Sequence, residues 1–158
     1  VLTSLLEMRH VAGDESLWTR LASAIQHEIG KQKPHVFVKE KLDERDVRHK
    51  RFGDTRYVVE PNVKDGKGGL RDLHSLFWIA KYAYRANSIV DIVKQGVLRD
   101  GEARKFALAQ RFLWTVRCHL HLRAGRAEER LDFEAQMMIA PRLGFADRVG
   151  MRGVERFM

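Results

Sequence analysis

The chain has 158 residues, 44% of them hydrophobic, which is enough apolar material for one packed core and excludes a disordered tail. Lysine and arginine number 29 against 21 acidic residues, so the formal net charge of +8 favours anionic partners. A single cysteine excludes an internal disulfide, and no apolar run approaches the ~20 residues of a membrane span, so we expect a cytoplasmic protein.

Both ends of the sequence indicate a fragment. The chain starts inside an apolar segment, VLTSLLEM, and stops at GVERFM, which is typical of the opening turns of a helix. We therefore expect a piece of a longer protein.

The first half of the chain begins with two predicted helices. The first, from Glu15 to Ile29, has an apolar repeat of 3.6 residues, and Gly30 is its expected end. Pro34 opens a second, highly charged helix that Gly53 ends. A thin apolar line predicts that this second helix lies on the surface: Val38, Leu42 and Phe52.

An extended segment and a third helix follow. The stretch TRYVVEP, residues 55–61, alternates and is rich in β-branched side chains, which predicts a short strand or an extended arm. The helix that starts at Leu70 has the clearest apolar face of the chain, formed by Leu70, Leu73, Phe77, Ala80 and Tyr84 and widened by Leu76, Ile79 and Ala83. A shorter helix spans residues 89–94, and Gly96 breaks it.

Two more helices complete the pattern. Asp100 can cap a long helix that runs to about Ala124, with a buried seam of Phe106, Ala109, Leu113, Val116 and Leu120. The last helix, residues 132–143, should turn Ala135, Met138 and Ile139 inward, and Pro141 should kink or end it. The sequence therefore predicts an all-α fold, a helical bundle with one short extended arm and a Gly-rich loop.

The Gly-rich loop lies in EPNVKDGKGGLRDLH, residues 60–74. Its glycines permit close approach of the backbone to a ligand, the next helix offers unpaired N–H groups, and Lys64, Lys67 and Arg71 add positive charge, which together favour phosphate binding. The alternative is a tight turn whose cations are neutralised by nearby acids: Glu60, Asp65 and Asp72. The spacing matches neither a P-loop nor a dinucleotide-binding pattern, so both interpretations stay open.

Other polar groups have simpler explanations. The cations at the end of the second helix, Arg45, Arg48, Lys50 and Arg51, suit the helix dipole. His119 and His121 point to nearly opposite sides of a helix, so they cannot share a metal. We interpret Cys118 as a packed thiol and the acidic group EERLDFE, residues 128–134, as solvated carboxylates at a helix start.

Two long motifs are similar to one known family. The first joins an Arg-His-x-Arg-aromatic stretch at residues 48–52, Tyr57, Glu-Pro-Asn-Val-Lys at 60–64, Gly-Gly-Leu-Arg-Asp at 68–72 and Trp78. The second, FLWTVRCHLHLRAGRAEERLDFEAQ, matches at Leu113, Trp114, Arg117, His121, Leu122, Arg126, Arg130, Leu131, Phe133 and Gln136. Together with the closing VERFM, they resemble the central region of the bacterial protein-PII uridylyltransferase/uridylyl-removing enzymes.

The resemblance implies a multidomain cytoplasmic nitrogen sensor. Its transferase domain would use Mg²⁺ and transfer UMP from UTP to a tyrosine of the PII signal protein. An HD-type hydrolase domain would remove the UMP, and further domains would sense glutamine. Residues 1–30 would be the tail of the transferase domain with connecting helices, and residues 31–158 the associated helical domain. Neither the paired aspartates of the transferase nor the His-Asp dyad of the hydrolase occurs here, so we expect no catalytic or metal-binding residues and no activity from the fragment alone.

The resemblance also suggests where UTP is contacted. The nucleotide or phosphate candidates are Lys64, Lys67, Gly68, Gly69, Arg71, Arg48 and Arg51, and Glu60 and Asp72 are candidates for ordering the loop. Two alternatives remain. The first is a basic nucleic-acid-binding module, in which Trp78 and Tyr82 lie toward the polar side of their helix and stack on bases. The second is a structural spacer between domains. Of the partners, we expect PII, UTP and neighbouring domains of the same chain, with nucleic acid disfavoured.

Overall fold

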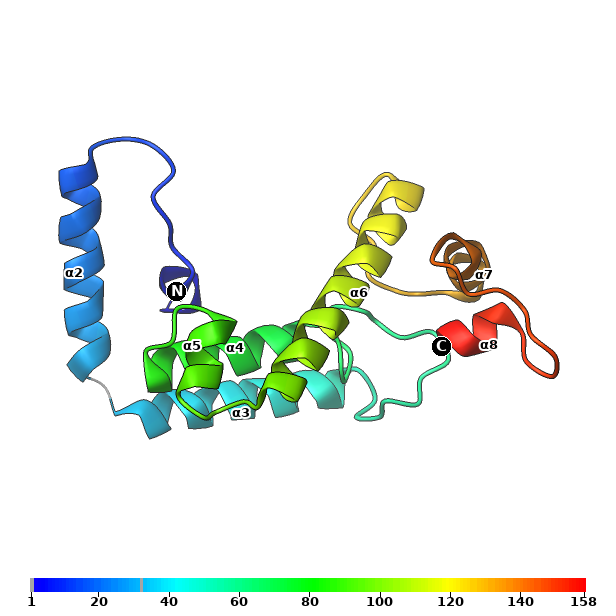
Figure 1. Ribbon diagram of the computed structural model, residues 1–158, viewed down its shortest axis with the longest axis horizontal. Helices are drawn as coiled ribbons and strands as arrows, with labels where there is room; N and C mark the ends of the chain where they lie inside the picture. Colours follow the sequence, from blue (N-terminus) through cyan, green and yellow to red (C-terminus); the bar gives the residue numbers. More distant parts are fainter. Residues whose placement is uncertain (1, 32) are drawn as a thin grey trace. The chain divides into compact units, whose positions relative to one another are not determined.

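A computed structural model describes residues 2–31 and 33–158. Over these residues the chain forms helices and irregular segments, with two isolated β-bridges and no strand, so the predicted all-α fold is confirmed (Figure 1). The helices are α1 (Leu2–Leu6), α2 (Glu15–Lys31), α3 (Pro34–Arg51), α4 (Leu70–Tyr84), α5 (Ile89–Lys94), α6 (Asp100–Ala124), α7 (Phe133–Arg142) and α8 (Gly153–Phe157). In the described part of the chain, no helix is long and apolar enough to cross a membrane.

The chain divides into two compact units. Unit 1 comprises Val1–Arg45 and His74–Ala103, and unit 2 comprises Asp46–Leu73 and Arg104–Met158. Helices α3, α4 and α6 each contribute residues to both units. The expected boundary after residue 30 stays a prediction.

Aromatic side chains form the main core of unit 1. Phe37 of α3 stacks on Tyr82 of α4, with ring centroids 4.1 Å apart, and Trp78 packs with them against Ile25 and Ile29 of α2. Trp78 and Tyr82 are both buried. Their expected position on the polar side of the helix is therefore wrong. The nucleic-acid alternative depended on these two rings being available to stack on bases, so it loses its main support.

The buried face of α4 is rotated from the predicted stripe. Leu70 and Ala80 are buried as expected, but Tyr84 and Leu76 are exposed. The large rings at positions 78 and 82 bury more apolar surface than the smaller side chains of the stripe, and they decide which side of α4 faces the core. In the same unit Ile92 of α5 packs against Ala80 and Ala86 in a second cluster.

The buried face of α3 is not the predicted apolar line either. Leu42 is partly exposed and Val47 largely so, whereas Phe37 in unit 1 and His49 in unit 2 are buried. Of these two buried residues, one is aromatic and one is polar, so α3 has no regular apolar repeat on its buried side.

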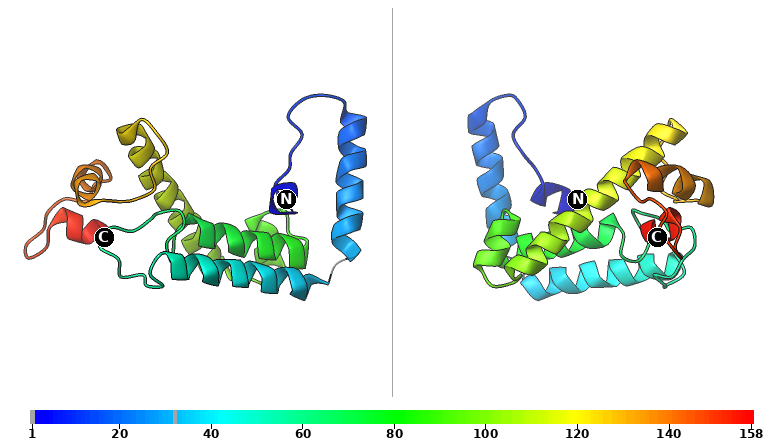
Figure 2. Two further views of the ribbon diagram at one scale, coloured as in Figure 1. Left: turned by 180° about the vertical axis from the view of Figure 1, so that it is seen from behind. Right: turned by 45° about the vertical axis from the view of Figure 1, so that its right-hand side comes forward.

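The core of unit 2 lies between α6, α7 and α8. Val116 and Leu120 of α6 pack with Ala135 and Ile139 of α7 and with Phe157 of α8. The predicted seams are thus confirmed at these positions, although Ala109 is exposed. Helices α7 and α8 lie side by side in both views of Figure 2.

Helix α7 is capped at its N-terminus by an aspartate side chain. The backbone N–H of Ala135 donates to Oδ1 of Asp132 at 2.7 Å, so Asp132 is the N-cap. Pro141 lies in the last turn, and the helix ends one residue later at Arg142. The end of the helix beside Pro141 agrees with the sequence-based expectation.

Candidate functional site: the glycine loop between α3 and α4

The expected arm runs as an irregular segment into the glycine loop, all within unit 2 (Figure 1). It is joined to the segment before α7 by an isolated antiparallel bridge between Asn62 and Arg130. Val63 N–H donates to the carbonyl of Glu129 at 2.8 Å, and Leu131 N–H donates to that of Pro61 at 2.9 Å. The loop is therefore fixed to a segment that lies far away in the sequence.

The loop satisfies most of its own backbone donors. The side-chain oxygen of Asn62 accepts from the N–H groups of Lys64 at 3.1 Å and Asp65 at 2.7 Å. Further along, Leu70 N–H donates to Val63 at 3.0 Å and Arg71 N–H to Lys64 at 2.8 Å. The N–H groups of Gly66, Gly69 and Asp72 also donate to carbonyls within the loop. A phosphate cradle made of backbone N–H groups needs these donors to be vacant, so phosphate contact here would rely on side chains.

The glycines serve this close backbone packing. A Cβ on Gly66 would lie 2.6 Å from the carbonyl oxygen of Asn62, and one on Gly69 would lie 2.9 Å from three carbonyl oxygens. Gly68 has a φ of +82°, which L side chains rarely adopt. Each glycine thus has a reason within the fold that involves no ligand.

Asp72 holds the loop to the end of α3. Its carboxylate accepts from Gly68 N–H at 2.8 Å and forms an ion pair with Arg48. His49 Nε2 lies 2.9 Å from each carboxylate oxygen of Asp72. One acidic side chain therefore joins the loop, the first turn of α4 and the last turns of α3.

Glu129 holds the loop to α6. Its two oxygens accept from Nε and Nη2 of Arg117, each at 2.8 Å, which is the bidentate geometry of a strong charge-assisted pair. Lys64 Nζ lies 3.7 Å and His121 Nε2 3.5 Å from Oε1 of the same carboxylate. Burial opposes ionisation, but Arg117, Lys64 and His121 outweigh it and hold the pKa of Glu129 below its usual value. The hydrogen bonds that Arg117 donates to Glu129 in turn raise the pKa of Arg117.

Sequence reasoning missed this second carboxylate. Glu129 lies in the acidic group that we interpreted as solvated, and for Glu129 that is wrong, because only 16% of its side chain is exposed. The matching family motif includes Arg117 and His121, which was the one signal that this part of α6 faces the loop.

The remaining candidates lie nearer the surface. Lys67 Nζ is 3.1 Å from Oδ1 of Asp54, and Arg71 Nε is 3.5 Å from Oδ1 of Asp65. Arg51 is exposed at the end of α3. Glu60 pairs with Arg130 and accepts from the N–H of Phe133 at 3.1 Å, so it contacts the segment before α7.

Lys67 also lines a hollow of about 570 Å³. Its walls are partly apolar, from Phe52, Val58 and Phe133, and two further cations, Arg56 and Arg130, lie along it. A concave surface with apolar walls and a few charged groups is typical of small-molecule sites.

Within residues 2–31 and 33–158, no group of three or more His, Cys, Asp or Glu side chains is arranged to hold a metal ion. The carboxylates of the site, Asp72 and Glu129, are each engaged by cations. This donor set does not fit Mg²⁺, which is held through carboxylates and substrate phosphates.

Comparison with known proteins gives one consistent family. The family model described as GlnD PII-uridylyltransferase matches residues 36–158. Relatives named bifunctional uridylyltransferase/uridylyl-removing enzyme are 51% identical in Bradyrhizobium sp. (strain ORS 278) and Azospirillum brasilense, and 52% identical in Rhodospirillum rubrum. Each alignment covers 100% of this chain and 17% of the relative, so the chain spans a small part of the relatives' length. No solved structure matches the chain.

Proposed function

Since this chain belongs to the GlnD PII-uridylyltransferase family, we propose that it is the helical domain that supports UMP transfer from UTP to a tyrosine of the PII signal protein. The full-length protein is then a cytoplasmic enzyme of nitrogen regulation that also removes UMP through a hydrolase domain. This chain contributes charge and shape beside the transferase domain rather than the reacting carboxylates.

One observation supports this role for the glycine loop: its cations fall into two groups. Arg48 and Arg117 are only 15% and 18% exposed, and each is held by the carboxylate that orders the loop. Lys67 and Arg71 are 40% and 34% exposed, in longer contacts with Asp54 and Asp65. Both pairs are more exposed to solvent than the pairs of Arg48 and Arg117, so these two cations can exchange a carboxylate for a phosphate more readily than the two buried ones.

Phosphoryl-type transfer depends chiefly on positioning and on neutralising charge. Lys67 and Arg71, with Lys64 and Arg51 nearby, supply positive charge toward the triphosphate of UTP or the leaving pyrophosphate, and the buried pairs keep the loop rigid. Bound Mg²⁺ would supply further neutralisation of the phosphate charge, and we assign its ligands to residues outside this chain.

The test uses the full-length enzyme. Arg71→Ala should lower UMP transfer about ten- to a hundredfold, the equivalent of one lost charge-assisted contact of roughly 1.5–3 kcal/mol. Removal of UMP and the melting temperature should change little, and Arg71→Lys should recover only part of the loss because lysine cannot form a bidentate contact. Arg142→Ala, at an exposed position of α7, is the matched control. Unchanged transfer by Arg71→Ala would refute the phosphate contact, and equal loss of both activities with a lower melting temperature would assign Arg71 to the structure of the loop.

A further inference from the structure

The side of α6 that faces away from the core of unit 2 carries an exposed row of side chains. At 100° per residue, positions 104, 107, 111, 114, 118 and 122 fall on the side opposite the buried Val116 and Leu120. We call Arg104, Ala107, Arg111, Trp114, Cys118 and Leu122 the outer face of α6. Leu122 is 81% exposed and Trp114 is 39% exposed, so this face leaves large apolar groups in water.

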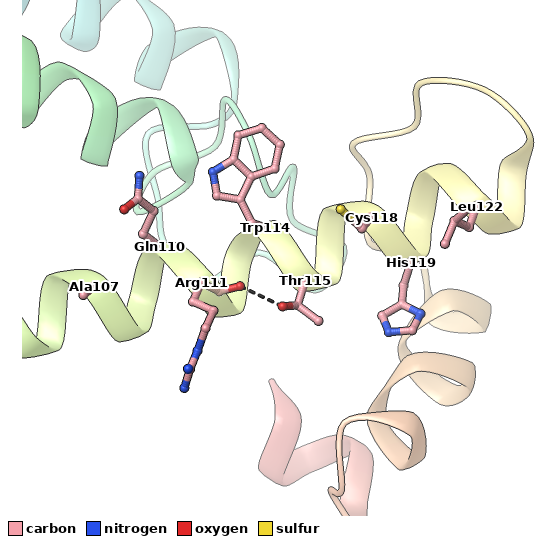
Figure 3. Close-up of a pocket in the computed structure, with 8 residues that line it drawn as sticks. All are labelled: Ala107, Gln110, Arg111, Trp114, Thr115, Cys118, His119 and Leu122. Atoms are coloured by element: carbon pink, nitrogen blue, oxygen red, sulfur yellow. Dashed lines mark hydrogen bonds between the residues drawn. The ribbon is translucent and has the colours of Figure 1, made fainter.

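A shallow hollow runs along this face. It has a volume of about 500 Å³ and is lined by residues from Ala107 to Leu122. Figure 3 shows these side chains along one stretch of α6, where the hydroxyl of Thr115 donates to the carbonyl of Arg111 at 2.8 Å. The hydroxyl of Thr115 is thus hydrogen-bonded within the helix. The rest of the surface that lines the hollow is mainly apolar.

Trp114 is held in place before any partner arrives. The guanidinium carbon of Arg117 lies 4.9 Å from the centroid of the Trp114 ring. Arg117 is itself fixed by its two hydrogen bonds to Glu129, each 2.8 Å long. A large aromatic group that is already ordered loses little conformational entropy on binding, which is the property of an interface anchor.

Beyond its first turn, which carries Asp100 and Glu102, the charge of α6 is positive. From Ala103 to Ala127 the chain has six Arg or Lys residues and no Asp or Glu. Three of these cations, Arg117, Arg123 and Arg126, pair with acids of the segment 128–134. Arg104 and Arg111 are exposed on the outer face, where they precede the apolar group along the helix. The outer face is therefore basic toward its N-terminal end and apolar toward its C-terminal end.

We propose that the outer face of α6 docks an acidic amphipathic helix of a partner polypeptide. Acidic side chains of that helix meet Arg104 and Arg111, and its aliphatic side chains cover Trp114, Cys118 and Leu122. From position 104 to position 122 the face is about 27 Å long at 1.5 Å per residue, which a helix of about five turns would cover. The docking is independent of nucleotide contact at the glycine loop.

Two other occupants fit less well. In a second copy of this chain, a parallel partner would place Arg104 and Arg111 opposite themselves, and an antiparallel one would bury these cations against Trp114 and Leu122. A nucleic acid would meet only two cations on this face before reaching the apolar half, whereas backbone binding draws on many phosphate contacts. The charge pattern thus favours an acidic and aliphatic helix.

The test uses the 158-residue chain and a designed peptide. A helical peptide of 18 residues carries Glu opposite Arg104 and Arg111 and Leu opposite Trp114, Cys118 and Leu122; a scrambled peptide and a version with Lys for Glu are the comparisons. Cys118 is the only cysteine and is exposed, so its rate of labelling by a maleimide reports cover at the centre of the face. Fluorescence anisotropy of the labelled peptide gives the affinity.

We expect the Glu peptide to slow the labelling of Cys118 and to bind at least tenfold tighter than the scrambled peptide. Leu122→Asp and Arg111→Glu should each weaken binding at least tenfold, while Val149→Asp and Arg142→Glu, at exposed positions elsewhere in unit 2, leave it unchanged. The double variant Arg104→Glu/Arg111→Glu should bind the Lys peptide in place of the Glu peptide, which a misfolded variant cannot do.

Equal binding of the scrambled peptide, or indifference to Leu122→Asp and Arg111→Glu, would overturn the proposal. Protection of Cys118 that grows with protein concentration in the absence of peptide would assign the face to a second copy. Protection by a single-stranded oligonucleotide but not by the Glu peptide would assign it to nucleic acid.

Discussion

Replacing Glu129 by glutamine should weaken unit 2 more than a change of one atom suggests. The carboxylate receives two hydrogen bonds from Arg117, and both side chains are more than four-fifths buried. Glutamine keeps one acceptor, loses the charge, and leaves one N–H of the guanidinium facing an amide. A hydrogen bond to a charged group contributes about 1.5–3 kcal/mol, so we expect the free energy of unfolding to fall by about 2–3 kcal/mol.

The pH dependence of stability gives a second readout of the same pair. The pKa of Glu129 is lowered in the folded state, so the unfolded state binds the proton more readily and the stabilisation is present above the unfolded pKa. It is lost as the pH falls through the folded pKa, below the ordinary glutamate value of about 4.3. Glu129→Gln has no such proton to bind, so its stability deficit should be largest near neutral pH and shrink in acid.

The assay is urea unfolding followed by circular dichroism at neutral pH and at successively lower pH. Glu134→Gln is the matched control, because Glu134 pairs with Arg123 at 2.6 Å but is 84% exposed. Its effect should stay below about 0.5 kcal/mol, as for most surface changes. A loss smaller than 1 kcal/mol for Glu129→Gln, or a deficit that does not depend on pH, would refute the assignment of Glu129 as a buried anchor of the loop.

Three further outcomes follow from the structure. Gly69→Ala should destabilise the chain by at least about 2 kcal/mol because its Cβ would lie 2.9 Å from three carbonyl oxygens, while Gly101→Ala, with open space around it in α6, should be neutral or slightly stabilising in thermal unfolding. Leu120→Ala should cost about 2–5 kcal/mol in the same measurement, against less than about 0.5 kcal/mol for the exposed Leu108→Ala. The chain alone, given labelled UTP, Mg²⁺ and PII, should incorporate no more label than a control without protein, and incorporation would contradict the placement of the catalytic carboxylates elsewhere.

Apolar periodicity found the parts of the fold that apolar packing determines. Val116 and Leu120 recur at helical spacing and are buried, as are Ala135 and Ile139 on α7. The same method failed at α3, where His49 is buried and Arg48 largely so, because a polar buried face has no apolar period.

The sequence located the glycine loop, but it did not show which ion pairs the charged side chains of the loop form. The motif predicted a charged glycine loop at residues 60–74, and the loop is there. Which cation meets which carboxylate depends on tertiary distances, and Arg48 lies 24 residues from Asp72 in the chain. Cys118 was also misjudged: it is exposed rather than packed, because its side of α6 is the outer face and not the seam.

The carboxylates change the meaning of the loop's positive charge. Four carboxylates, those of Asp72, Glu129, Asp54 and Asp65, lie beside five Lys or Arg side chains, so most of the positive charge at the loop is compensated within the chain. In the function that we propose, a triphosphate would replace Asp54 at Lys67 or Asp65 at Arg71, which is an exchange of one anion for another. Exchange of this kind costs little at exposed pairs and much at buried ones, because a buried cation without its partner is strongly destabilising. In the function that we propose, the depth of each pair would therefore favour Lys67 and Arg71 over Arg48 and Arg117 as contacts for UTP.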